Sequence, residues 1–137
     1  MSEAPARPSR FGPVIDRLWT TIGERKARAD KLVANRAEHG ASPAKETDQP
    51  RSYTVELLTA PPDTLNKKIA EEATEVILSA KEYETARAQG SEGVSVYGTG
   101  RDHLIYELGD LTYHLLVLCA QWDVTPDDIA SELERRF

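Results

Sequence analysis

The sequence predicts an all-α fold, and three observations support that class. Apolar residues recur at helical spacing in three long stretches, two helix starts carry clear capping residues, and only residues 94–97 have the composition of a strand. The chain has 137 residues, of which 39% are hydrophobic and 29% charged, values that are typical of one globular domain. We therefore expect a single helical domain over residues 11–137.

The N-terminal part predicts one helix between two irregular segments. Residues 1–10 are rich in Pro, Ser, Ala and Arg, and we expect them to be disordered. Apolar residues at helical spacing, Leu18 and Ile22 among them, predict a helix that runs on past Arg28. Residues 39–50 have the composition of a flexible linker.

Two helices are predicted between this linker and a glycine-rich loop. Residues 52–58 form a short helix that ends before the proline pair at 61–62. Asp63 is the expected N-cap of a long helix that runs to about residue 88. Residues 90–100 contain four glycines and predict a flexible loop.

Two capping motifs mark the starts of the last two helices. Thr99 and Asp102 stand three residues apart, as in a capping box, before a helix that runs to about Trp122. Thr125 is the expected N-cap of the final helix, with Pro126 in its first position.

The charge distribution limits the possible partners. Residues 1–51 hold ten Lys/Arg and seven Asp/Glu, a net charge of +3, whereas residues 52–137 hold seven and sixteen, a net charge of −9. A body this acidic argues against nucleic-acid binding, because phosphate backbones are bound by basic surfaces. The acidic residues are either a solvated surface or ligands for a divalent cation.

Hydropathy and cysteine content indicate the compartment. No apolar run approaches the roughly 20 residues that span a bilayer, and the N-terminus lacks the apolar segment of a secretory signal, so we expect no membrane association. The single cysteine, Cys119, excludes an intrachain disulfide and a thiolate metal cluster. We expect a reduced, cytoplasmic protein.

An apolar stripe runs along each of the two longest helices of the acidic part, and we expect both stripes to face the core. The second helix is apolar almost all round, which favours a central position or a dimer interface. The first stripe consists of Ile69, Ala73, Val76, Ile77 and Ala80, and the second of Leu104, Leu108, Leu111, Leu115, Leu118, Cys119 and Trp122.

Each stripe has a pair of carboxylates on the same flank. At about 100° per residue, Glu72 and Glu75 lie beside the first stripe as Glu107 and Asp110 lie beside the second. If the helices pack antiparallel through their stripes, the four side chains converge. Oxygen donors around one point suit a hard cation such as Mg²⁺ or Mn²⁺. A single E-x-x-E pair is more often a solvated face, so the matching pairs are what favour a metal site.

Four segments, in order, resemble the phosphoribosyl-ATP pyrophosphatase family of histidine biosynthesis. They are SYT at 52–54, KKIAEEATEV at 67–76, ELGDLTYHLLVL at 107–118 and LERR at 133–136. The resemblance implies an all-α nucleotide pyrophosphohydrolase bundle completed by homodimerisation. It also implies Mg²⁺-dependent hydrolysis of phosphoribosyl-ATP to phosphoribosyl-AMP and pyrophosphate, with Mn²⁺ as a substitute cation.

The resemblance also implies roles for individual residues. Glu71 is either an extra ligand or the base that activates water, and Glu75 is the other candidate for the catalytic group. His114 lies near the acidic flank. We expect its ring to form a hydrogen bond with a neighbour across the bundle, which is favoured over the alternative that it supports a metal ligand. The implied metal ligands are Glu72, Glu75, Glu107 and Asp110, and the implied phosphate contacts are Arg51, Ser52, Thr54, Lys67 and Lys68.

The chain departs from the family pattern outside these motifs, and other functions stay open. Three segments differ from the family pattern: the proline pair at 61–62, the longer segment before Arg51 and the loop at 90–100. These differences affect loop geometry and substrate contacts, but none of them removes a carboxylate. One alternative is a house-cleaning enzyme of the same superfamily that hydrolyses dUTP or a damaged nucleoside triphosphate. A second alternative is a helical dimerisation module without catalytic activity.

Overall fold

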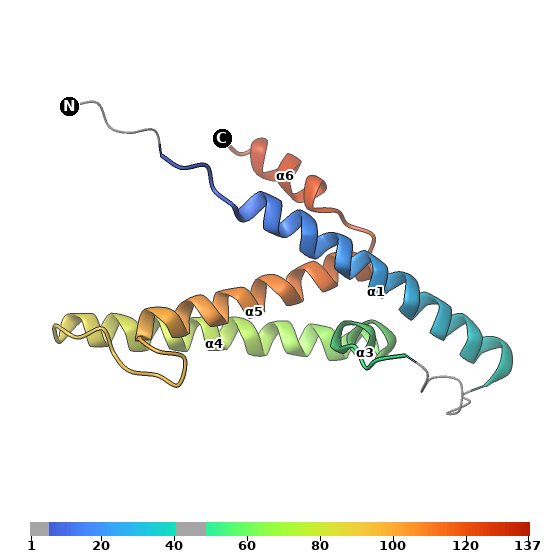
Figure 1. Cartoon of the computed structure of the whole chain (residues 1–137), viewed down its shortest axis with the longest axis horizontal. Helices are drawn as coiled ribbons and strands as arrows, with labels where there is room; N and C mark the ends of the chain where they lie inside the picture. The colour runs from blue at the N-terminus through green and yellow to red at the C-terminus, as the bar shows by residue number, and fades with distance from the viewer. Residues whose placement is uncertain (1–5, 41–48) are drawn as a thin grey trace.

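The described part of the chain is helical, which confirms the all-α class (Figure 1). The computed structural model describes residues 6–40 and 49–137, and within them only an isolated bridge between Ser95 and Gly98 has β geometry. None of the helices in these ranges is long and apolar enough to cross a membrane. The helices are α1 (Phe11–His39), α3 (Tyr53–Thr59), α4 (Pro62–Ala88), α5 (Gly100–Gln121) and α6 (Pro126–Glu134).

The predicted irregular segments fall only partly within the described residues. Residues 6–10 precede α1 without helical structure, whereas residues 1–5 of the expected disordered segment lie outside the described ranges. Most of the predicted linker, residues 41–48, also lies outside them, and its first residue, His39, is the last residue of α1.

The helix starts follow local capping chemistry, with one correction. Thr99 forms the predicted capping box, and Thr125 is the predicted N-cap of α6, where it also forms a capping box with Asp128. Asp63 is not the N-cap of α4, because that helix begins at Pro62 with Pro61 as its cap. The fixed φ of proline suits the first helical position, and Asp63 lies instead in the first turn, where a carboxylate still complements the helix dipole.

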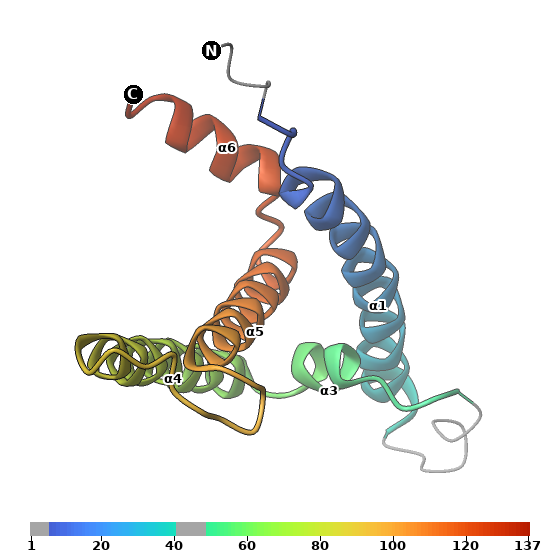
Figure 2. The ribbon, with the colours of Figure 1, turned by 60° about the vertical axis from the view of Figure 1, so that its left-hand side comes forward.

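α4 and α5 form one pair of helices, and α1 and α3 pack against this pair. α4 and α5 lie side by side and run antiparallel, and the 89–99 loop joins them at the far end (Figure 1). α1 packs against α3 and α5, while α6 extends from the end of α5 toward the start of α1 and buries no residue (Figure 2). The buried core lies where α1, α3, α4 and α5 meet and consists of Ile22, Leu57, Leu65, Leu116, Val117 and Ala120.

Only part of each predicted apolar stripe of α4 and α5 packs toward the core, as Ile69 and Leu118 do. Ile77 of the first stripe is 67% exposed, and Leu108, Leu115 and Trp122 of the second are exposed too. The buried positions of α4 are Leu65, Glu72 and Ser79, at intervals of seven residues, and those of α5 include Glu107 and His114. The ionisable residues therefore lie between the helices, and part of each apolar stripe is left on the outside.

Candidate metal centre

Three glutamates meet between α4 and α5. Glu72 and Glu75 project from consecutive turns of α4 and Glu107 from α5, and one carboxylate oxygen of each lies within 4.8 Å of the other two. Glu72 and Glu107 are only 4% and 5% exposed, whereas Glu75 lies at the exposed edge. We call these three residues the carboxylate cluster. Oxygen donors at this spacing suit a small divalent cation.

Each buried glutamate has one paired and one unpaired oxygen. Oε1 of Glu72 lies 2.9 Å from Lys68 Nζ, and Oε1 of Glu107 lies 3.0 Å from Nε2 of His103. Oε2 of both glutamates is buried, and no described residue donates a hydrogen bond to it. An unsatisfied buried acceptor costs about 1–3 kcal/mol, and more when it is charged. A cation would satisfy both oxygens, so the residues present fit a divalent metal.

The clustered charges change the pKa values of the carboxyl groups. Burial, and after it the carboxylates of Glu72 and Glu107, raises the pKa of Glu75. Burial also acts to raise the pKa of Glu72, but the ammonium group of Lys68 outweighs it and lowers that pKa. Mutual repulsion of this kind favours cation binding, because a cation stabilises all the carboxylates in their charged form.

His114 holds α3 against α5. Its Nδ1 lies 2.7 Å from the backbone oxygen of Asp110, which only accepts, so Nδ1 carries the proton and Nε2 accepts from the hydroxyl of Tyr53 at 3.1 Å. A second hydrogen bond joins the hydroxyls of Thr54 and Tyr113. The expectation that His114 bonds a neighbour across the bundle is confirmed.

Comparison with known proteins identifies the family. The sequence model of the phosphoribosyl-ATP pyrophosphohydrolase family matches residues 38–137. The chain belongs to this family. The matched residues span α3 to α6 and include all the carboxylates that the sequence singles out.

Three relatives named phosphoribosyl-ATP pyrophosphatase illustrate the extent of the similarity. The protein of Paracidovorax citrulli is 34% identical over 114 residues, which cover 83% of this chain and 71% of the relative. The protein of Janthinobacterium sp. (strain Marseille) is 40% identical over 94 residues, covering 69% and 73%. The protein of Geotalea daltonii is 37% identical over 100 residues, covering 73% and 74%.

Two further carboxylates that the family resemblance implicates lie beside the cluster. Asp110 is half-buried, and burial followed by the charge of Glu72 raises its pKa, so its carboxylate lies within electrostatic range of the cluster. Glu71 is exposed, and its Oε2 accepts a hydrogen bond from Lys68 at 3.2 Å. Asp110 stays a predicted fourth ligand, and Glu71 stays a predicted ligand or base.

The five predicted phosphate contacts occupy different positions. Arg51 pairs with a glutamate of α3 at 3.0 Å, and Ser52 is the N-cap of α3. Thr54 bonds to α5, and Lys67 is exposed on the first turns of α4. Only for Lys68 does the structure record a contact with the carboxylate cluster.

Sequence reasoning missed His103. This half-buried residue binds Glu107 and lies 3.8 Å from a carboxylate oxygen of Glu82 on α4, so it connects the two helices beside the cluster. The available signal was its position four residues before Glu107, because side chains at that spacing share one helix face.

Proposed function

We propose that this protein hydrolyses phosphoribosyl-ATP to phosphoribosyl-AMP and pyrophosphate in histidine biosynthesis, with Mg²⁺ as its cofactor. The relatives carry the name phosphoribosyl-ATP pyrophosphatase. The structural observation that carries the proposal is the pair of buried, unpaired oxygens on Glu72 and Glu107 beside the carboxylate of Glu75. Mn²⁺ suits the same oxygen donors. We also propose a cytoplasmic location, because a reducing compartment suits a chain whose one cysteine is Cys119.

The carboxylates would hold the cation and leave room for phosphate. Glu72, Glu75, Glu107 and Asp110 are the proposed ligands. A bound Mg²⁺ would supply positive charge beside the nucleotide phosphates and so would stabilise the negative charge of the leaving pyrophosphate. Ser52, Thr54, Arg51 and the lysines at 67–68 are the proposed phosphate contacts.

A carboxylate of the chain would accept the proton of the attacking water. The water oxygen bonds to the α-phosphorus, the bond from that phosphorus to the α–β bridging oxygen breaks, and its electron pair leaves with pyrophosphate. Glu71 and Glu75 are the candidates for the base. Glu71 pairs with Lys68, whereas Glu75 lies at the exposed edge of the cluster.

Pyrophosphate release tests this function. We expect turnover of phosphoribosyl-ATP that requires Mg²⁺ and stops with EDTA. Glu75→Gln and Asp110→Asn should lose it while helicity is retained, and Glu84→Gln, an exposed carboxylate of α4, should not. Preference for dUTP would move the protein to the house-cleaning class. Folded protein that hydrolyses none of phosphoribosyl-ATP, dUTP and ATP would support a dimerisation module.

We also propose that the protein forms a homodimer through α4 and α5. Leu104, Leu108, Leu111, Leu115 and Leu118 follow one another at alternating intervals of four and three residues, the spacing of helix–helix seams. Leu108 and Leu115 are exposed, as are Ile77 and Leu78 of α4. The exposed leucines of this seam, together with Ile77 and Leu78, favour a partner, because large apolar patches on soluble proteins mark interaction surfaces.

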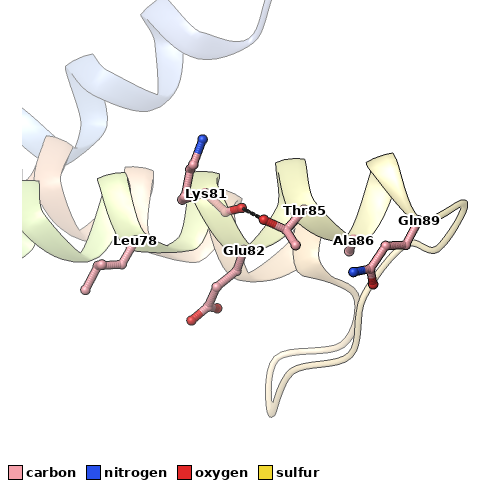
Figure 3. A pocket seen from close by; sticks show the side chains of 6 residues that line it. All are labelled: Leu78, Lys81, Glu82, Thr85, Ala86 and Gln89. Atoms are coloured by element: carbon pink, nitrogen blue, oxygen red, sulfur yellow. Dashed lines mark hydrogen bonds between the residues drawn. The ribbon is translucent and has the colours of Figure 1, made fainter.

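Shallow hollows along the outer side of α4 support the same arrangement. One is lined by Ala70, Glu71, Thr74, Glu75 and Leu78. The next is lined by Leu78, Lys81, Glu82, Thr85, Ala86 and Gln89 (Figure 3). All of these residues belong to α4, so a second copy would supply the opposite wall, beside Glu75.

Sedimentation measures the association directly. We expect the wild-type protein to sediment as a dimer, and Leu108→Glu combined with Leu115→Glu to give a monomer. Val94→Glu, a change on the exposed 89–99 loop, is the matched control and should stay dimeric. A monomeric wild-type protein at micromolar concentration would contradict the proposal.

A further inference from the structure

The 89–99 loop places one aromatic side chain on α5. The ring of Tyr97 stacks on that of Tyr106, with centroids 4.0 Å apart and planes inclined by 16°. It also lies over the ring of His103, at 5.1 Å and 29°. The loop emerges at the end of the α4–α5 pair and runs back beside the first turns of α5 (Figure 1).

This aromatic group adjoins the carboxylate cluster. His103, which Tyr97 covers, is the residue whose Nε2 lies 3.0 Å from Glu107 Oε1. A single imidazole ring therefore separates Tyr97 from a cluster member. Tyr106 lies one turn before Asp110, and the charge of Asp110 raises the pKa of Tyr106.

The loop is shaped to present this ring. Gly98 has φ of +117°, and a Cβ there would lie 2.7 Å from a carboxylate oxygen of Asp102, so the turn after Tyr97 requires glycine. Hydrogen bonds between Ser95 and Gly98 close the turn. The neighbouring Val94 and Val96 are fully exposed, so the loop is not anchored by a hydrophobic contact of theirs.

The stacked rings still present a large accessible surface. Tyr97 is 44% exposed and Tyr106 is 46% exposed, although they contact each other. Exposed aromatic rings bind nucleobases by stacking, and removing one such ring typically weakens binding by roughly 5- to 150-fold per base. The substrate of the proposed reaction carries a purine linked to the phosphates that the cation would hold.

We propose that Tyr97 and Tyr106 form the stacking surface for the adenine of the substrate, next to the carboxylate cluster. The inference rests on the proposed function, because it places the base of the same nucleotide whose phosphates lie at the metal. The phosphates are held on the carboxylate side of His103 and the base on its aromatic side. Tyr97 thus contributes affinity for the base by stacking, and the carboxylates serve the phosphates.

Binding measurements with two probes test the proposal apart from turnover. The first probe is α,β-methylene-ATP, whose α–β linkage resists hydrolysis, and the second is inorganic triphosphate, which lacks a base. With Mg²⁺ present, Tyr97→Leu should weaken binding of α,β-methylene-ATP by about tenfold or more and leave binding of inorganic triphosphate unchanged. Tyr97→Phe, which keeps the ring, should bind both probes like the wild-type protein, and so should the loop control Val96→Ala.

A wild-type measurement keeps the test independent of any effect of substitution on folding. In protein with ¹³C-labelled tyrosine rings, α,β-methylene-ATP should shift the ring resonances of Tyr97 and Tyr106, and inorganic triphosphate should not. Equal weakening of both probes in Tyr97→Leu, no weakening of either, or unshifted ring resonances would overturn the proposal. Base-dependent binding without hydrolysis of phosphoribosyl-ATP would instead leave the stacking surface intact and refute the proposed reaction.

Discussion

Glu107 connects the stability of the fold to the cation, and replacing it with glutamine tests that link. Its Oε2 is buried and has no hydrogen-bond partner among the residues that the structure describes, and the carboxylates of Glu72 and Glu75 lie close by. Glu107→Gln removes one of three clustered negative charges but keeps a side chain that can still bond His103. We expect the metal-free variant to be more stable than the metal-free wild type, by about 1 kcal/mol, and to respond weakly to Mg²⁺.

The size of the expected shift follows from mass action. At a free Mg²⁺ concentration of about 100 Kd, a ligand that binds only the folded state stabilises it by about 2.7 kcal/mol. The entropy of unfolding is about 0.29 kcal/mol/K for 137 residues, so the wild-type Tm should rise by about 9 °C. If loss of a ligand weakens binding by about 100-fold, the same Mg²⁺ concentration stabilises the variant by about 0.4 kcal/mol, a rise of roughly 1.4 °C.

Calorimetric melting with EDTA and with Mg²⁺, at one protein concentration, measures both quantities. Glu84→Gln is the matched control, because Glu84 is exposed on α4 and pairs with Lys81 away from the cluster. It should keep the full wild-type shift. An unchanged Mg²⁺ shift in Glu107→Gln, or no shift in the wild type, would refute the assignment of a cation to this cluster.

Three further predictions use other contacts. Tyr53→Phe leaves Nε2 of buried His114 without its donor and should lower the free energy of unfolding by about 1–3 kcal/mol in urea titrations. The raised pKa values of Glu75 and Asp110 mean that protonation favours the metal-free fold. That stabilisation is lost as the pH rises through those pKa values. Because protons compete with Mg²⁺ for the same carboxylates, the affinity for Mg²⁺ should fall on acidification, and Mg²⁺ binding should release protons. Titration calorimetry in buffers of different ionisation enthalpy measures the number of protons released. Thr99→Ala removes a cap and should cost about 1 kcal/mol in the same urea titrations.

Helix starts were predictable where the determining residues are neighbours in sequence. The N-caps Thr99 and Thr125 depend on a side chain and a backbone amide three residues apart, and both are N-caps as predicted. Asp63 was assigned the wrong position because Asp and Pro both favour helix starts. At this start Pro62 occupies the first position of the helix.

The sequence predicts which residues share a helix face better than it predicts which face packs against the neighbouring helix. A helical wheel correctly separates the carboxylates from the apolar stripes, but it does not say which face meets the neighbouring helix. α5 is apolar on several sides, so Leu116 and Val117 can be buried while Leu108 and Leu115 stay exposed. His103 acquires its role only when Glu82 of α4 is brought beside it, a contact that depends on the tertiary fold.

α4 and α5 bury carboxylates between them and expose apolar side chains on the outside, and this arrangement has a practical consequence for redesign. The proposed cation ligands Glu72 and Glu107 lie on the inner side, whereas Leu108 and Ile77 are exposed on the outer side. Replacing the outer apolar residues would reduce the exposed apolar surface, but it would also remove the wall that a second copy would place beside Glu75. Cation preference can be varied from the inner side without adding exposed apolar surface.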